Sequence, residues 1–153
     1  MDNKDISRNS LKAWVLASRP KTLTGASVPV MIGLSLAWTA VGAEDFKLLP
    51  AVLCVLFAFI MQIDANFVND YFDFVSGKDD EQRLGPARAC AMGWIEKGKM
   101  RWGIIITTAL ACMVGLPLVL YGGMEMILVG ALCVVFCFLY TTLLASHGLG
   151  DLL

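Results

Sequence analysis

The residues best suited to chemistry lie at the end of an apolar segment, in the stretch MQIDANFVNDYFDFVSGKDDEQRLGP, residues 61–86. If this segment stays helical through Val75, side chains three or four residues apart share a face. Asp64 then faces nearly the opposite way. We assign it no function and expect it either to pair with another helix or to lie in a water-filled crevice. The polar side chains that share one face, within an arc of about 100°, are Gln62, Asn66, Asn69, Asp70 and Asp73.

This polar stripe needs a positive partner. A helix C-terminus carries a partial negative charge, so Asp70 and Asp73 are repelled by the helix dipole and by each other. Two carboxylates one turn apart, beside amide oxygens, suit Mg²⁺, which proteins bind through one or two carboxylates together with substrate phosphates. Lys78, Arg83 and Arg88 follow and can bind phosphate oxygens. The stripe therefore predicts a magnesium and phosphate site, with a solvated helix end as the alternative.

The elements that position these residues are membrane spans. The chain is 58% hydrophobic and 16% charged, with a mean hydropathy of +0.70, whereas soluble domains average about 45–50% apolar and about 25% charged. Polar segments at 1–22, 42–47, 76–102 and 122–125 flank apolar ones. We predict one domain over residues 1–153, an all-α, polytopic membrane helical bundle. Its four spans, each long enough at roughly 20 residues to cross a bilayer, cover 23–41, 48–68 with helical continuation to 75, 103–121 and 126–144.

The basic residues predict the orientation of the bundle. Eleven of the twelve Lys and Arg residues lie before the first span or in the loop 76–102. The positive-inside rule therefore places the N-terminus and this loop in the cytoplasm. A cleaved signal peptide is disfavoured because the first apolar segment is too long and further spans follow. The five cysteines and one histidine form no metal-binding pattern.

Three stretches carry a resemblance to a known family. NDYFDFVSGKDDEQRLGPARA, residues 69–89, resembles the first aspartate-rich motif of the UbiA superfamily of intramembrane prenyltransferases. ASRPKTLTGASVPVMIG, residues 17–33, is similar to the start of that family's first helix. YTTLLASHGLGD, residues 140–151, is similar to the end of its fourth helix and the following loop. The resemblance is strongest to the branch that acts on 1,4-dihydroxy-2-naphthoate in menaquinone synthesis.

The resemblance implies a fold, a cofactor and site residues. The family fold has roughly nine helices around a cavity that opens sideways to lipid, and this chain corresponds to the first part of it. Two aspartate-rich motifs in that cavity hold Mg²⁺ against an isoprenoid diphosphate. Residues matching the first motif are assigned to the Mg²⁺ and diphosphate site or the cavity lining: Asn66, Asn69, Asp70 and Asp73, with Asp79 or Asp80 as a further carboxylate.

The resemblance also implies a reaction and partners. A polyprenyl group passes from polyprenyl diphosphate to 1,4-dihydroxy-2-naphthoate, giving demethylmenaquinone with release of diphosphate and CO2. Lys21, Arg83 and Arg88 are expected to bind the diphosphate or the carboxylate of the acceptor, or to be ordinary positive-inside charges. The expected setting is a bacterial cytoplasmic (inner) membrane, and no nucleic acid is expected as a partner.

Two departures from the family pattern keep alternatives open. Gly77 occupies the position where many members have a third aspartate, so the third ligand stays open between Asp79 and Asp80. The second aspartate-rich motif is absent, and we therefore expect an incomplete chain, inactive alone unless a C-terminal half or a second copy supplies that motif. The alternatives are another aromatic acceptor, a phosphatidyltransferase acting on a CDP-alcohol, whose motif does not occur in order here, and a non-catalytic four-span membrane subunit.

Overall fold

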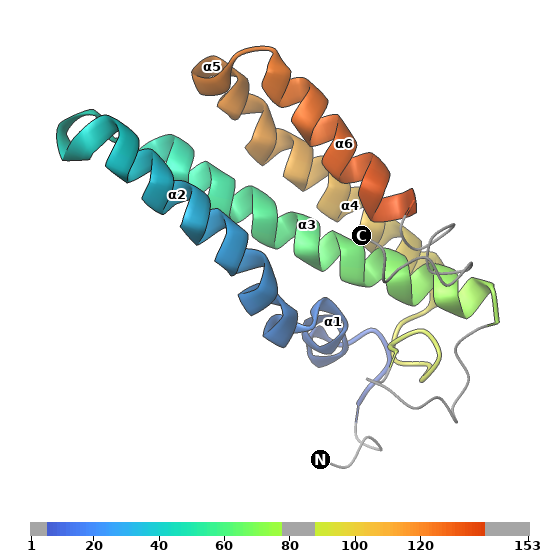
Figure 1. Ribbon diagram of the computed structural model, residues 1–153. Helices are drawn as coiled ribbons and strands as arrows, with labels where there is room; N and C mark the ends of the chain where they lie inside the picture. The colour runs from blue at the N-terminus through green and yellow to red at the C-terminus, as the bar shows by residue number, and fades with distance from the viewer. Residues whose placement is uncertain (1–5, 78–87, 140–153) are drawn as a thin grey trace.

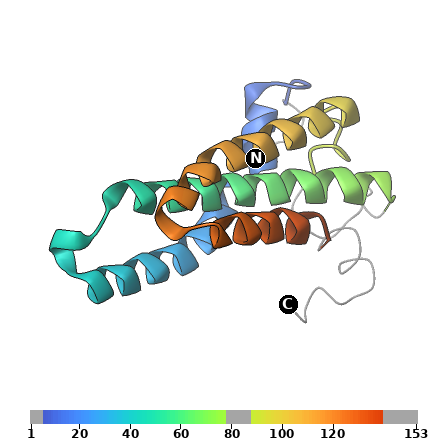
Figure 2. The same ribbon diagram turned by 90° about the horizontal axis from the view of Figure 1, so that it is seen from above.

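A computed structural model describes residues 6–77 and 88–139, and every regular element in these two ranges is a helix (Figure 1). The longest helix, α3, contacts α1, α2, α4 and α6. Both views show α3 running the length of the bundle with the other long helices beside it (Figures 1 and 2). In chain order the elements are α1 (Leu11–Ser18), η2 (Pro20–Thr22), α2 (Leu23–Asp45), α3 (Leu48–Val75), α4 (Lys97–Gly115), η3 (Leu116–Leu118), α5 (Val119–Gly122) and α6 (Glu125–Leu139).

The helices have the length and composition of membrane spans. Within the described residues, three helical stretches are long and apolar enough to cross a bilayer, Leu11–Asp45, Leu48–Val75 and Lys97–Gly122. The fourth predicted span, 126–144, corresponds to α6, which is described as far as Leu139. On α2 no residue is buried, and its large apolar side chains point outward, as they do on a surface in contact with lipid. The prediction of an all-α membrane helical bundle is confirmed.

Helix α1 lies within the segment 1–22, for which the sequence pattern indicates only polar character. The hydroxyl of Ser10 accepts a hydrogen bond from the backbone N–H of Ala13 at 3.2 Å, which caps the first turn of the helix. The helix ends where Arg19 adopts a left-handed backbone with φ of 50° and Pro20 follows. The serine cap before an apolar run is a sequence signal for this helix, but the helix is too short to span a membrane.

Helix α1 packs across α3 and α4 through Trp14. The Trp14 ring meets the Phe67 ring edge-on, with 5.4 Å between the ring centroids. On α4, Gly103 lies beneath the same ring, and a Cβ atom at that position would come within 2.7 Å of it. The absence of a side chain at Gly103 is therefore what lets α1 approach α4 this closely.

Most of the buried core lies at the end of α3 that carries the carboxylates. It combines Ala13 and Ala17 of α1, Phe67 and Val68 of α3, the start of α4, and the segment 88–96 that precedes α4. The backbone N–H of Asn9 donates to the carbonyl oxygen of Trp94 at 2.7 Å, and the N–H of Glu96 donates to the Asn9 side-chain oxygen at 3.1 Å. These bonds tie the 88–96 segment to the N-terminal part of the chain.

Asp64 links α3 to α4 at the level of the spans. Its side chain is 0% exposed, and its carboxylate accepts hydrogen bonds from the hydroxyls of Thr107 and, at 2.8 Å, Thr108. A carboxyl group at membrane depth needs such partners because lipid offers none. Of the two alternatives left open for Asp64, the structure shows the partner on another helix. The contact fixes the position of α3 along α4.

A double-mutant cycle tests the Asp64 contact. We expect Thr108→Val to lower the free energy of unfolding by roughly 1 kcal/mol in the native chain and by close to zero in the Asp64→Ala chain, since interhelical hydrogen bonds in membranes contribute about 0.6 kcal/mol on average. The measurement is unfolding of the purified protein in detergent micelles. Thr39→Val is the control, because the Thr39 hydroxyl bonds the carbonyl of Leu36 in its own helix. Equal losses in both backgrounds would contradict the contact.

Candidate functional site

The polar stripe forms as predicted, because α3 continues to Val75. Its part nearer the membrane centre contacts the turn between α1 and α2. The Asn66 amide donates to the carbonyl of Ser18 and to the hydroxyl of Thr22, both at 2.9 Å, and the Gln62 amide donates to the same hydroxyl at 3.4 Å. These bonds satisfy polar groups that would otherwise face lipid, and they hold the start of α2 against α3.

Asp70 is the anchor of the 88–96 segment. Its side chain is 1% exposed, and its two oxygens accept hydrogen bonds from the backbone N–H groups of Ala89 at 2.7 Å and Cys90 at 2.9 Å. Hydrogen bonds to a charged acceptor are stronger than neutral ones, so this carboxylate fixes the start of the segment over the end of α3. Burial raises the pKa of the Cys90 thiol, and the nearby negative charge of Asp70 raises it further.

Asp73 pairs with Arg88. One guanidinium nitrogen of Arg88 lies 2.7 Å from the Asp73 carboxylate, and the two side chains are only 10% and 14% exposed. A pair so far removed from water is screened little by salt, and removing one partner leaves a costly uncompensated charge. Arg88 is thus the positive group that the stripe required.

The structure brings some of the predicted site residues together and not others. Asp70, Asp73 and Arg88 form one cluster at the end of α3, and Asn69 is half-buried on the same helix. Lys21 lies exposed in η2, next to the Thr22 that contacts the stripe. Asp79, Asp80 and Arg83 lie outside the described residues.

The donor set of this cluster fits Mg²⁺ in type. Two carboxylates one helical turn apart are the hard oxygen ligands that this ion takes, with the remaining positions filled by water or phosphate. Asp70 and Asp73 now accept hydrogen bonds from the protein, so an ion at Asp73 has to compete with Arg88. Across 6–77 and 88–139, no three acidic, histidine or cysteine side chains lie close enough to hold a metal. A third carboxylate would have to come from outside these ranges, for example from Asp79 or Asp80.

The backbone donors of the cluster could not be found from the sequence. Arg88 was predicted as a cation for phosphate, and its pairing with Asp73 was not foreseen. The N–H donors of Ala89 and Cys90 cannot be recognised from residue type, because every residue except proline has a backbone N–H group. The motif match that includes Arg88 and Ala89 does not reveal that the backbone N–H of Ala89 donates to Asp70.

Comparison with known proteins adds an independent observation. The model of a family described as the UbiA prenyltransferase family matches residues 26–153. The chain is 35% identical over 161 residues to 1,4-dihydroxy-2-naphthoate octaprenyltransferase of Escherichia coli (strain K12), covering 99% of this chain and 51% of the relative. Proteins of the same name are similar in Haemophilus influenzae, with 37% identity over 69% of this chain and 34% of the relative, and in Mycobacterium tuberculosis, with 33% identity over 86% and 44%.

The chain spans about half or less of the length of these curated relatives. No solved structure matches the chain significantly.

Labelling of Cys90 tests the anchoring role of Asp70. Asp70→Asn turns one acceptor oxygen into an N–H donor, which then faces a backbone N–H. We expect the 88–96 segment to open more often, since hydrogen bonds to charged groups contribute roughly 1.5–3 kcal/mol. Loss of the Asp70 charge also lowers the pKa of the Cys90 thiol. Both effects should make Cys90 react with a water-soluble maleimide faster, by about tenfold or more. The rate is read by peptide mass spectrometry. Asp45→Asn, at an exposed carboxylate at the end of α2, is the control, and an unchanged rate in Asp70→Asn would show that other contacts hold the segment.

Proposed function

Because the chain belongs to the UbiA prenyltransferase family, as its aspartate-rich motif predicted, we propose that it serves the transfer of a polyprenyl group to 1,4-dihydroxy-2-naphthoate. The donor is a polyprenyl diphosphate, and the products are demethylmenaquinone, diphosphate and CO2. The single observation that carries the proposal is the cluster of Asp70, Asp73 and Arg88, buried at the end of a membrane helix within the part of the chain that matches the family.

The relatives support the choice of acceptor. The three named above are each called 1,4-dihydroxy-2-naphthoate octaprenyltransferase, and all are bacterial. We therefore propose the cytoplasmic membrane of a bacterium as the location. The concentration of Lys and Arg before the first span and around the 88–96 segment supports a cytoplasmic N-terminus.

We assign Asp70 and Asp73, with Asp79 or Asp80, to the binding of Mg²⁺. The bound ion would neutralise the leaving diphosphate and so favour cleavage of the allylic C–O bond. Arg88 is a charge-matched partner for the same diphosphate: its guanidinium already lies at 2.7 Å from a carboxylate oxygen and can donate equally to phosphate oxygens. Transfer of Arg88 from Asp73 to the diphosphate frees that carboxylate for the ion.

Asp70 also positions Arg88, and further residues are assigned to binding the substrates. Asp70 holds the backbone of Ala89 and thereby keeps Arg88, the preceding residue, above the end of α3. We assign Asn66 and Asn69, which lie on the same stripe, to the substrate-binding site. We assign Lys21 and Arg83 to the binding of either the diphosphate or the carboxylate of the acceptor, because a positive charge attracts both groups.

The proposal is tested by prenyl transfer in membranes that contain the chain, supplied with polyprenyl diphosphate and 1,4-dihydroxy-2-naphthoate. The chain is assayed alone and co-expressed with the part of the Escherichia coli relative that the alignment does not cover. We expect transfer that stops with EDTA and returns with Mg²⁺. Asp70→Asn and Asp73→Asn should each lower the rate by about 100-fold, the usual effect of removing one electrostatic contact to a leaving group.

Asp45→Asn is the control for these two variants, because Asp45 is also a carboxylate on a membrane helix but is exposed and distant in the chain. It should leave the rate unchanged. Transfer that persists without divalent ions, or in both Asp70→Asn and Asp73→Asn, would reject the proposed site. In that case the polar stripe serves packing, and the transfer depends on other residues. Absence of transfer from both the chain alone and the co-expressed chain would instead favour a non-catalytic membrane subunit.

A further inference from the structure

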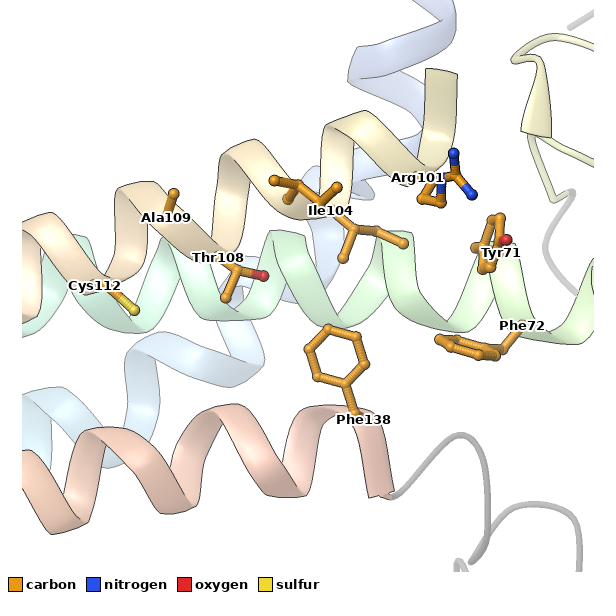
Figure 3. A pocket seen from close by; sticks show the side chains of 9 residues that line it. Tyr71, Phe72, Arg101, Ile104, Thr108, Ala109, Cys112 and Phe138 are labelled. Carbon is orange, nitrogen blue, oxygen red and sulfur yellow. The ribbon is translucent and has the colours of Figure 1, made fainter. Parts of the chain in front are cut away.

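An apolar groove lies between α3, α4 and α6, with a volume of about 610 Å³ (Figure 3). Tyr71 and Phe72 line it from α3, Phe138 from α6, and the residues from Arg101 to Cys112 from one face of α4. Figure 3 shows Arg101 and Tyr71 together at one end of the groove and Cys112 at the other. The groove is therefore polar at one end and apolar along the rest of its length.

The groove has the dimensions of one membrane leaflet. Arg101 and Cys112 both line it, and at 1.5 Å of rise per residue they lie about 16 Å apart along α4. Half of a typical bilayer core is about 15 Å thick. An acyl chain that starts at Arg101 would thus end near Cys112, close to the middle of the bilayer.

The charges at the open end match an anionic head group. Among the described residues that line the groove, Arg101 is the one charged side chain. Lys97 and Lys99 are exposed on the first turn of the same helix, and Trp102 is 61% exposed, as is common for tryptophan at a membrane surface. Basic residues at such a surface attract anionic lipids, and basic pockets between membrane helices bind their head groups.

The groove is separate from the cluster proposed for catalysis. Tyr71 and Phe72 line it, but Asp70 and Asp73 do not. Those two carboxylates instead face the 88–96 segment and Arg88. The groove and the cluster therefore use different residues of α3.

We propose that this groove binds an anionic phospholipid. The lipid belongs to the leaflet on the same side of the membrane as the basic residues at the start of α4. The phosphate pairs with Arg101 through charge-assisted hydrogen bonds. One acyl chain lies along α4 between α3 and α6, against Ile105, Ala109 and Phe138. The lipid fills a space that these three helices leave open and so joins α6 to the helix that carries the catalytic cluster.

The test is native mass spectrometry of the full chain in detergent micelles, titrated with phosphatidylglycerol or with zwitterionic phosphatidylcholine. We expect one phosphatidylglycerol to bind per chain, more tightly than phosphatidylcholine. Arg101→Gln should weaken phosphatidylglycerol binding by about tenfold or more, as expected for loss of a charged hydrogen bond. Ala109→Phe, which fills the groove without changing any charge, should abolish the one-to-one complex.

Two matched controls separate this site from general attraction to the membrane. Lys99→Gln removes an exposed cation of the same helix outside the groove, and Ala40→Phe adds a ring on the exposed face of α2. Ala40→Phe should leave binding unchanged, and Lys99→Gln should weaken it much less than Arg101→Gln does. Ile105→Phe is a second groove-filling variant if Ala109→Phe does not fold, and circular dichroism of each variant checks the fold.

Several results would overturn the proposal. Equal weakening by Lys99→Gln and Arg101→Gln would mean diffuse surface attraction. Unchanged binding in Ala109→Phe and Ile105→Phe would place the lipid elsewhere, and equal affinity for the two lipids would exclude recognition of the head group. Displacement of phosphatidylglycerol by polyprenyl diphosphate would assign the groove to that diphosphate. A lipid-free dimer that dissociates in Ala109→Phe would assign it to a second copy of the chain.

Discussion

The described fold depends on one constraint, that polar side chains on a helix within a bilayer must find their partners in the protein. Helix α3 carries several such side chains, and three different elements satisfy them. Asp64 contacts α4, Asn66 contacts the turn between α1 and α2, and Asp70 contacts the backbone of Ala89 and Cys90. Apolar packing alone discriminates poorly between neighbours in lipid, because lipid tails are as apolar as the side chains. These hydrogen bonds therefore decide which elements surround α3 and at what height.

The same groups serve the fold and the proposed chemistry. Asp70 and Asp73 hold the 88–96 segment through backbone N–H groups and Arg88, and they are the carboxylates proposed to bind Mg²⁺. Without the ion, the positive partners come from the chain itself, which avoids two unpaired carboxylates at the membrane edge. On the proposed function, binding of Mg²⁺ and diphosphate exchanges one set of positive partners for another. The position of the 88–96 segment, which Asp70 anchors, then depends on which groups bind the carboxylates.

Much of this arrangement could be predicted from residue types and spacing. Hydropathy located the spans, because a bilayer demands about 20 apolar residues per crossing. Helical periodicity placed Asn66, Asp70 and Asp73 on one face, and the acidic motif indicated the family. What could not be predicted depends on tertiary contacts. The partners of Asp64 lie more than forty residues away on α4, and the backbone donors to Asp70 have no residue signature. Helix α1 was missed because hydropathy searches for segments long enough to span the membrane, and this helix has 8 residues.

The assignment of Asp70 and Asp73 to a metal–diphosphate site is tested most directly by the binding of Mn²⁺, a paramagnetic substitute for Mg²⁺. Binding is followed by electron paramagnetic resonance in the presence of an unreactive polyprenyl thiodiphosphate. We predict bound Mn²⁺ that requires the thiodiphosphate and is lost in Asp73→Asn. In Arg88→Gln, where the competing cation is removed, Mn²⁺ should bind to some extent without the thiodiphosphate. Mn²⁺ binding that is absent from the native chain, or equal in the native chain and Asp73→Asn, would contradict the assignment of these carboxylates to a metal–diphosphate site.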